Sequence, residues 1–321
     1  KKNKGKKWLK IGGGILLLLL LLASFVYWYI NRIGQGTRAG SLPEAYQLVK
    51  ANGYAFSVKI SGQKSNPAVI LLHGFPESSF MWKGLMADLN QRGYYTIAPD
   101  QRGYSFQARP SAVEEYQMSH LAADVMGLAD ALGIDQFHLI GHDWGAAVGW
   151  QVATDHPDRI LSYTAMSVPH LDAFSKAYLE DSVQYAASSY IRDLQTWKFP
   201  EFILARQDYK MLASFWDQQP KEEIAAYKAL FSQKGALTSA INWYRANYDL
   251  FNEGYTLGQT KVPVLFLWGK NDFALMRSGA EATEQYVSDY YRFVELAAGH
   301  WLIQEAYDRV QKEVLAHLER F

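Results

Sequence analysis

The stretch FHLIGHDWGAAVG, residues 137–149, joins an apolar run, a turn between two glycines and a helical pattern that starts with small side chains. Gly141 and Gly145 stand on either side of the turn, where a strand crosses tightly into a helix and a side chain would obstruct it. Asp143 occupies the tip of that turn. The pattern predicts a strand followed at once by a helix, as in α/β folds with a parallel sheet.

Short apolar runs alternate with helical patterns on both sides of this stretch. The predicted strands are Tyr54–Ile60, Ala68–His73, Tyr94–Pro99, Gln136–Ile140, Ile160–Ser167, Val262–Trp268 and Arg292–Leu296. The predicted helical stretches are 79–91, 119–132, 145–155 and 303–320. This alternation predicts a mostly parallel sheet with helices on both faces, formed by residues 44–170 and 259–321.

Residues 171–258 interrupt the alternation. They contain no convincing strand pattern but many aromatic, helix-compatible segments. We expect this segment to form a helical cap over the carboxyl ends of the strands, because open α/β sheets bind their ligands there.

The amino-terminal part has a different character. Residues 1–10 form a basic tail with six lysines, residues 11–30 carry no charge, and residues 31–43 read as a polar linker. Twenty helical residues extend roughly 30 Å, the thickness of a bilayer's hydrocarbon core. Seven consecutive leucines leave no polar face, so this segment is predicted to be a single transmembrane helix, with the aromatic residues 27–29 at the interface.

Two further expectations concern this span. The six lysines before it, against Arg32 and Arg38 after it, favour a cytoplasmic amino terminus and a catalytic domain on the opposite side. A cleavable signal peptide is the alternative, although its apolar region is usually shorter and no small-x-small site follows the leucines directly.

Composition excludes several classes of protein. The chain has no cysteine, so it has no disulfide, zinc-thiolate site or cysteine nucleophile. Outside the basic tail, 26 basic residues face 32 acidic ones, a net charge of about −6. An acidic body does not fit nucleic-acid binding. The histidines show no metal-ligand spacing, and we expect neither a metal nor a cofactor.

Asp143 admits two interpretations: an N-cap of the following helix, or a nucleophile. Asp272 and His300 favour the second, because each follows a predicted strand. Nucleophile, acid and histidine then appear in the chain order of α/β hydrolases, with Asp in place of the usual Ser. His300 is the expected base and Asp272 its orienting acid. The other histidines, at 73, 120, 138, 142, 156, 170 and 317, are predicted to be structural or on the surface.

Together, five motifs resemble the α/β-hydrolase-fold epoxide hydrolases over residues 40–321. They are His73-Gly74-Phe75-Pro76-Glu77, Asp100-Gln-Arg102-Gly103-Tyr104-Ser105, Gly141-His142-Asp143-Trp144-Gly145, Asn242-Trp243-Tyr244-Arg245 and Gly299-His300-Trp301. The apolar span ahead of them is similar to that of the membrane-anchored branch. The resemblance implies that the backbone N–H groups of Phe75 and Trp144 form an oxyanion hole.

The resemblance also implies two tyrosines in the cap that protonate the epoxide oxygen. The cap offers eight, at 178, 185, 190, 209, 227, 244, 248 and 255. Tyr244 matches the family motif, and Tyr190 is the better partner because Gln195 follows five residues later, although Trp197 stands where the family usually has proline. Tyr185 remains the reserve candidate.

An aspartate nucleophile has a chemical reason. A carboxylate attacks a saturated carbon without an activating base and leaves an ester that water hydrolyses, whereas a serine would leave a stable ether. The predicted reaction converts an epoxide and water to a vicinal diol, on a small lipophilic substrate. A haloalkane-type dehalogenase shares the first half-reaction, but Phe75 cannot supply the side-chain amide usual there. A ligand-binding protein on the same fold is the non-enzymatic alternative. The oligomeric state is not predicted.

Overall fold

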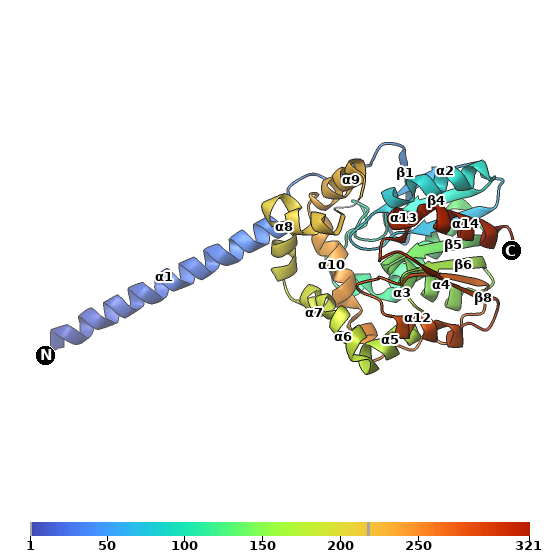
Figure 1. Cartoon of the computed structure of the whole chain (residues 1–321). Helices are drawn as coiled ribbons and strands as arrows, with labels where there is room; N and C mark the ends of the chain where they lie inside the picture. Colours follow the sequence, from blue (N-terminus) through green and yellow to red (C-terminus); the bar gives the residue numbers. More distant parts are fainter. Residues whose placement is uncertain (1, 217–218) are drawn as a thin grey trace.

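The computed structural model of the chain describes residues 2–216 and 219–321, with the side chains of the first helix described from residue 15 onward. An eight-stranded sheet lies at its centre (Figure 1). The strands are β1 (Tyr46–Ala51), β2 (Tyr54–Ser61), β3 (Ala68–Leu72), β4 (Tyr95–Pro99), β5 (Phe137–His142), β6 (Ile160–Met166), β7 (Val264–Gly269) and β8 (Tyr291–Leu296). Their spatial order is β1-β2-β4-β3-β5-β6-β7-β8, and only β2 runs antiparallel to its neighbours.

Helices cover both faces of the sheet, as predicted. The helices outside the cap are α2 (Lys83–Gln91), α3 (Met118–Leu132), α4 (Trp144–Asp155), α12 (Arg277–Ala282), α13 (Leu302–Glu305) and α14 (Tyr307–Leu318), with 3₁₀ turns η1 (Ser79–Trp82), η2 (Glu114–Tyr116) and η4 (Thr283–Tyr286). In β3, Val69 and Leu71 pack with α2 and α14, while Ile70 and Leu72 pack with α3 and α4. A strand buried on both faces has to be continuously apolar, which is why β3 was recognisable from sequence.

Strand β1 was not predicted. It lies at the edge of the sheet, where Leu48 is exposed and only Val49 and Ala51 are buried. An edge strand half covered by solvent lacks the continuous apolar run used to find the others. The predicted helix 303–320 was wrong in one respect, because a break at Ala306, with φ −141°, divides it into α13 and α14.

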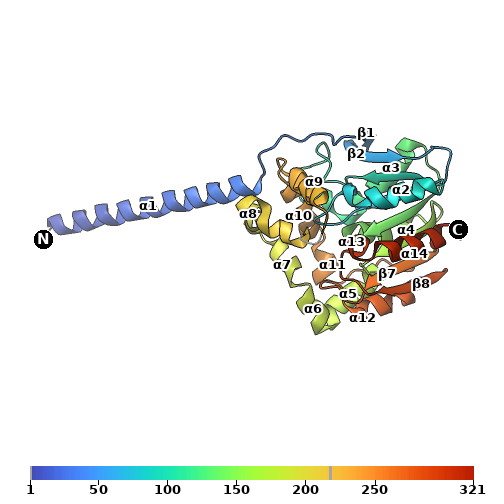
Figure 2. The ribbon, with the colours of Figure 1, turned by 45° about the horizontal axis from the view of Figure 1, so that its top comes forward.

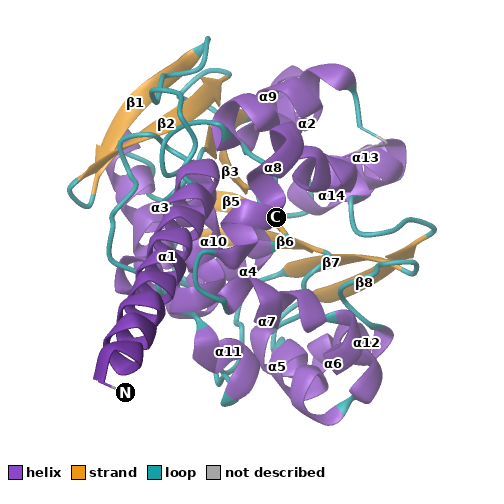
Figure 3. Cartoon of the chain, turned by 90° about the vertical axis from the view of Figure 1, so that its left-hand side faces the viewer, coloured by secondary structure: helices purple, strands orange, loops and turns teal. Residues whose placement is uncertain are grey.

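The segment 171–258 forms helices and no strand in the part that the structure describes. These are α5 (Leu171–Glu180), α6 (Ser182–Ala187), α7 (Ser189–Gln195), α8 (Phe199–Ala213), η3 (Ser214–Trp216), α9 (Lys221–Phe231), α10 (Ala236–Ala246) and α11 (Tyr248–Asn252). We call residues 171–258 the cap. Viewed along α1, the cap helices lie in front of the sheet (Figure 3).

Helix α1 (Lys2–Gly34) projects away from the body as one straight rod (Figures 1 and 2). The segment Ile15–Gly34 is long and apolar enough to cross a membrane. It is exposed from Ile15 to Tyr29, whereas Gly34 at its end is buried against the body. Residues 31–34, assigned to the linker from sequence, continue the helix. The rod meets the body at cap helix α8.

Candidate active site

Asp143 sits between β5 and α4 in a backbone conformation that L-residues avoid, with φ +51° and ψ −125°. Such a conformation costs about 1–3 kcal/mol and persists where the surroundings enforce it. A Cβ at Gly145 would overlap the carbonyl oxygen of Leu72, and one at Gly141 would overlap Gly145 itself. Asp143 occupies the N-cap position of α4 but makes no side-chain capping hydrogen bond. Asp143 is therefore the N-cap residue by position, but its side chain does not cap the helix and points to other partners.

The Asp143 carboxylate lies against the backbone N–H groups of Phe75 and Trp144. The Phe75 N–H donates to Asp143 Oδ1 at 2.7 Å. Burial raises the pKa of Asp143, but the hydrogen bond and charge of His300, with a smaller contribution from the Trp144 N–H, lower it. Phe75 reaches this position because its loop follows β3, which pairs with β5. Gly74 lies against the same carboxylate, where a Cβ would overlap Oδ1. The two expected oxyanion donors thus converge on one carboxyl group.

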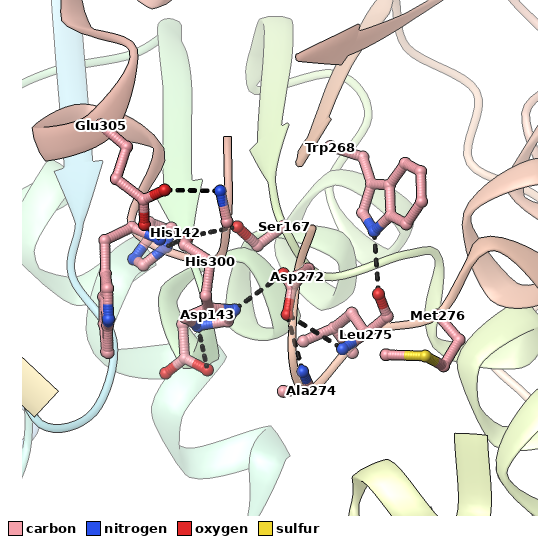
Figure 4. A network of polar contacts seen from close by, with 12 residues as sticks. His142, Asp143, Ser167, Trp268, Asp272, Ala274, Leu275, Met276, His300 and Glu305 are labelled. Carbon is pink, nitrogen blue, oxygen red and sulfur yellow. Dashed lines mark hydrogen bonds and ion pairs between the residues drawn. The ribbon is translucent and has the colours of Figure 1, made fainter. Parts of the chain in front are cut away.

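His300 lies between the two aspartates (Figure 4). Its Nδ1 is 2.8 Å from Asp272 Oδ2, and its Nε2 is 3.6 Å from Asp143 Oδ2. The other oxygen of Asp272 accepts the N–H groups of Ala274 and Leu275 at 2.8 and 3.1 Å. Asp272 is thus held by backbone donors and holds one ring nitrogen of His300, which leaves the other nitrogen facing Asp143.

A second layer of polar groups fixes the backbone of His300. The Ser167 hydroxyl donates to the His300 carbonyl at 2.9 Å, and His142 Nε2 lies 2.9 Å from the same oxygen. His142 Nδ1 is 3.4 Å from Glu77 Oε2, both side chains being fully buried. Glu77 is part of a motif in the sequence, but no role was predicted for it. The feature that could have indicated a buried role is that no basic residue stands next to this carboxylate in the sequence.

The charges of Asp143 and His300 depend on each other. Burial by itself raises the pKa of Asp143, but hydrogen bonding and attraction to His300 leave that pKa below its usual value. Burial by itself lowers the pKa of His300, but Asp272 and Asp143 together raise it to about 10. Near neutral pH the pair is therefore a carboxylate beside an imidazolium.

Tyr190 on α7 and Tyr244 on α10 face Asp143 from the cap. Their ring centroids are 6.3 Å apart, and both side chains line, together with Asp143, the two cavities described below. Burial, and then the charge of Asp143 among other groups, raise the pKa of Tyr190 well above its usual value. Burial and the neighbouring Tyr190 do the same for the pKa of Tyr244. Both hydroxyls are therefore protonated at neutral pH.

Tyr185, the reserve candidate, lies elsewhere. Its side chain is 47% exposed, Arg192 lies over its ring at 4.1 Å, and it is absent from the lining of both cavities. Gln195, by contrast, donates to the Tyr244 carbonyl at 3.1 Å and so ties α7 to α10.

Two cavities meet at Asp143 and the two tyrosines. The back cavity is small, about 30 Å³, and the front chamber is about 720 Å³. The back cavity is lined by buried apolar side chains, among them Leu250 and Phe251. The front chamber is bounded by α7, α8 and the His300 loop. A reacting group at Asp143 thus has a small apolar space on one side and a large, mostly apolar one on the other.

Comparisons with known proteins agree with this geometry. Residues 67–307 match the family described as the alpha/beta hydrolase fold. The chain is 32% identical to Epoxide hydrolase 4 of Mus musculus, over 85% of this chain and 79% of that protein. It is 33% identical to the AB hydrolase superfamily protein YfhM of Bacillus subtilis, over 85% and 97%. An inhibitor complex of a Bacillus megaterium epoxide hydrolase superposes with a TM-score of 0.78 and 25% identity, covering 85% and 100%.

The chain belongs to the α/β-hydrolase-fold epoxide hydrolases. It is an enzyme that hydrolyses epoxides. This finding decides among the three functions that the sequence left open, and it removes the support for a dehalogenase or a non-catalytic binding protein. Among the residues that the structure describes, no group of three or more His, Asp or Glu side chains is arranged to hold a metal ion.

Proposed function

We propose that Asp143 is the nucleophile and that the reaction passes through an ester on its side chain. A carboxylate oxygen attacks one epoxide carbon, the bond between that carbon and the ring oxygen breaks, and the ester forms. The observation that supports this most directly is the position of the carboxylate. It is buried, ionised beside His300, and open to both cavities.

Tyr190 and Tyr244 would protonate the departing ring oxygen. This oxygen stays attached to the substrate as a strongly basic alkoxide, so it needs an acid within hydrogen-bond reach. Two tyrosines whose pKa values are raised keep their protons until that oxygen develops charge. The remaining cap tyrosines stay structural in this account.

The protons balance if His300 begins as an imidazolium. Ester formation removes the negative charge of Asp143, which is one of the two groups that raise the pKa of His300. The imidazolium then releases its proton, which restores the tyrosine that gave one to the substrate. Neutral His300 next takes a proton from water, and the resulting hydroxide attacks Cγ of Asp143. Collapse of the intermediate, whose oxyanion the N–H groups of Phe75 and Trp144 would stabilise, releases the diol and returns the carboxylate beside an imidazolium.

Replacement of His300 tests whether it is the base of the second half-reaction and is not needed for ester formation. In His300→Gln the first half-reaction retains its nucleophile and its acids, but the ester has no base for its hydrolysis. We expect mixing with an epoxide to add the mass of one substrate molecule to the peptide that contains Asp143, without turnover. An unmodified peptide, with diol still formed, would contradict the assignment of His300 as the base of the second step.

The two cavities suggest which epoxides fit. A cavity of about 30 Å³ has room for roughly two water molecules, hence for a hydrogen or a methyl group. The front chamber of about 720 Å³, lined mostly by apolar side chains, has room for a long or bulky apolar substituent. We propose a terminal or methyl-terminated epoxide with one lipophilic arm as the preferred substrate.

A matched panel tests the substrate assignment. It pairs 1,2-epoxydodecane with 6,7-epoxydodecane, which have the same atoms and similar hydrophobicity but place the ring at the end or in the middle of the chain. We expect kcat/KM to be higher for the terminal isomer, by about tenfold or more. Equal values would contradict the preference for a terminal epoxide.

We also propose that α1 anchors the enzyme in a membrane as a single span, with the catalytic domain opposite the cytoplasmic side. The length and apolar composition of Ile15–Gly34 support this proposal, and so does the exposure of residues 15–29 outside the body. The lysine excess before the span supports the orientation.

A further inference from the structure

The end of α1 is fixed to the cap rather than tethered through a flexible segment. The ring of Tyr29 on α1 meets Phe202 on α8 at 6.2 Å in an edge-on contact. Five residues later Gly34 lies so close to Glu201 that a Cβ there would be 2.5 Å from the Glu201 Cβ. Beyond the helix, the Thr37 N–H donates to the Ser232 carbonyl at 3.0 Å. The direction of α1 is therefore set by cap helix α8.

This contact determines the level at which α8 would meet a bilayer. An uncharged segment ending at Ile30 places Tyr29 at the boundary between hydrocarbon and headgroups. The contacts with α8 run from Tyr29 to Gly34, a rise of about 7.5 Å along the helix axis. Helix α8 is thus at headgroup depth if α1 spans the membrane.

The part of the cap at this level carries exposed apolar side chains. Trp197, just before α8, is 66% exposed and Phe199 is 59% exposed. Met211 is 47% exposed; it lies beyond a non-helical break in α8 at residues 206–209 but lines the same chamber as Phe199. Phe199 lies three residues before Phe202, so the two share one side of α8 and Phe199 is one turn from the contact with α1. Exposed aromatic residues at an interface are typical of protein surfaces that touch the headgroup region.

Charges around these side chains also fit a phospholipid surface. Lys198 lies beside Trp197, 4.9 Å from its ring centroid, and Arg206 and Lys210 on α8 are exposed. Two exposed acidic residues lie among them: Asp208 is paired with Lys228, and Asp193 lines the front chamber. The four cations Lys198, Arg206, Lys210 and Lys228 outnumber them. Cationic side chains around an aromatic cluster favour the phosphate groups of lipids.

The same helix forms a wall of the front chamber. Phe199, Pro200, Ile203 and Leu204 line it, and Phe199 is both a lining residue and one of the most exposed. The wall of the chamber formed by Phe199 therefore reaches the surface that α1 would hold against the bilayer. We propose that this face, the α8 face of Trp197, Phe199 and Met211, docks into the membrane interface and opens the chamber toward the lipid, so that a lipophilic epoxide reaches Asp143 without leaving the bilayer.

This inference rests on the anchor and the reaction proposed above, and the chain offers a direct way to test it separately. Because the sequence has no cysteine, a single introduced cysteine is the only site for a spin label. We would label Trp197→Cys, Leu19→Cys and Lys64→Cys in the full chain, reconstituted in phosphatidylcholine vesicles. Lys64 is exposed in the turn before β3, at the amino ends of the parallel strands, whereas the cap lies over their carboxyl ends. It serves as the aqueous control.

The measurement is the ratio of collision rates with oxygen, which concentrates in lipid, and with a nickel chelate, which stays in water. We expect Leu19 to report lipid, Lys64 water, and Trp197 a ratio several-fold above that of Lys64. A lipid value at Leu19 with an aqueous value at Trp197 would overturn the docking and keep the anchor. An aqueous value at Leu19 would overturn both, whereas turnover of a water-soluble epoxide reports on the reaction alone.

A kinetic comparison tests whether the docked face delivers substrate. Trp197 does not line the chamber, so Trp197→Glu changes the membrane contact and leaves the cavity walls as they are. In Trp197→Glu we expect the ratio of kcat/KM for vesicle-borne 1,2-epoxydodecane to that for 1,2-epoxybutane to fall about tenfold. Trp197→Phe keeps an aromatic ring at this position and should retain the wild-type ratio. An unchanged ratio in Trp197→Glu would contradict delivery from the bilayer.

Discussion

The floor of the active site, provided by the sheet, differs from its roof, provided by the cap, in how functional groups are held. On the floor, hydrogen bonds of 2.7–3.1 Å hold the groups in place: Asp272 accepts backbone N–H groups and contacts His300, and the Phe75 N–H donates to Asp143. On the roof, Tyr244 is packed edge-on against Trp144 at 5.0 Å and Phe75 at 5.6 Å. Directional bonds fix the nucleophile and base, while aromatic packing fixes the acids and the shape of the cavities.

This difference predicts which substitutions abolish the reaction and which change its substrate preference. Floor groups act as one charge-coupled unit, since Asp143 and Asp272 both raise the pKa of His300. A substrate in the front chamber would touch mostly roof residues, because the cap supplies most of its lining. We therefore expect floor substitutions to remove turnover and roof substitutions to change its rate or its substrate range.

The largest effect is expected for the nucleophile. Asp143→Ala removes the group that forms the ester, and kcat should fall at least about 10⁴-fold. Diol formation measured by mass spectrometry over a long incubation checks this. Phe75→Leu keeps the backbone N–H and serves as a control that should retain much of the activity. Residual turnover of Asp143→Ala above a few per cent would place the chemistry on another residue.

Loss of the roof acids should come next. Tyr244→Phe or Tyr190→Phe removes one hydroxyl and keeps the ring packing, so each should slow ester formation about 10²-fold, and the double change about 10⁴-fold. Rapid-mixing measurement of the first turnover separates ester formation from hydrolysis. Tyr185→Phe is the matched control, since its side chain is on the surface, and it should have wild-type rates. If Tyr185→Phe is slow and Tyr190→Phe is not, the pair is wrongly assigned.

A smaller effect is expected from enlarging the back cavity. Leu250→Ala should raise kcat/KM for 6,7-epoxydodecane relative to 1,2-epoxydodecane by about tenfold, because the mid-chain ring then has room for both arms. Leu212→Ala is the matched control: Leu212 is a fully buried cap leucine outside both cavity linings. Both changes should lower the free energy of unfolding by about 2–5 kcal/mol. The same selectivity change in both variants would point to general loosening of the cap.

The subtlest effect concerns the charge of His300. Asp143→Asn removes one of the two carboxylates that raise the pKa of His300 to about 10, so that pKa should fall. A raised pKa stabilises the fold fully below the ordinary value of 6.5, and this contribution is lost as the pH rises through about 10. Titration of the ring by nuclear magnetic resonance checks the pKa, with His300→Gln to assign its signal. Thermal melting between pH 6 and 10 should show a weaker pH dependence in Asp143→Asn. Identical titration curves would mean that Asp143 does not control the base.

Sequence patterns predicted the floor well, for a physical reason. Asp143, Asp272 and His300 each follow a buried parallel strand, and the carboxyl ends of such strands meet at one edge of a sheet. The positions of these three residues after predicted strands were therefore enough to predict that they meet in space. Strand β1 escaped detection because an edge strand has no continuous apolar run, and the break at Ala306 has no proline or glycine to mark it.

The roof was less predictable. The preference for Tyr190 over Tyr185 rested on one spacing, that to Gln195. It is the directions of their helices that put Tyr185 on the surface and Tyr190 in the cavities. The narrow back cavity depends on how Leu250 and Phe251 pack against core residues distant in sequence. The contact between Glu77 and His142 joins residues 65 positions apart and shows no local pattern.

A single turnover in ¹⁸O-water, with enzyme in excess over epoxide, tests the central claim that Asp143 forms the ester. Water attacks Cγ in this account, so the label should appear in the carboxylate of Asp143, and the first diol should carry the unlabelled oxygen of that side chain. Mass spectrometry of the Asp143 peptide and of the diol measures both. Label in the first diol, with none in Asp143, would mean that water attacks the epoxide directly and would contradict the account.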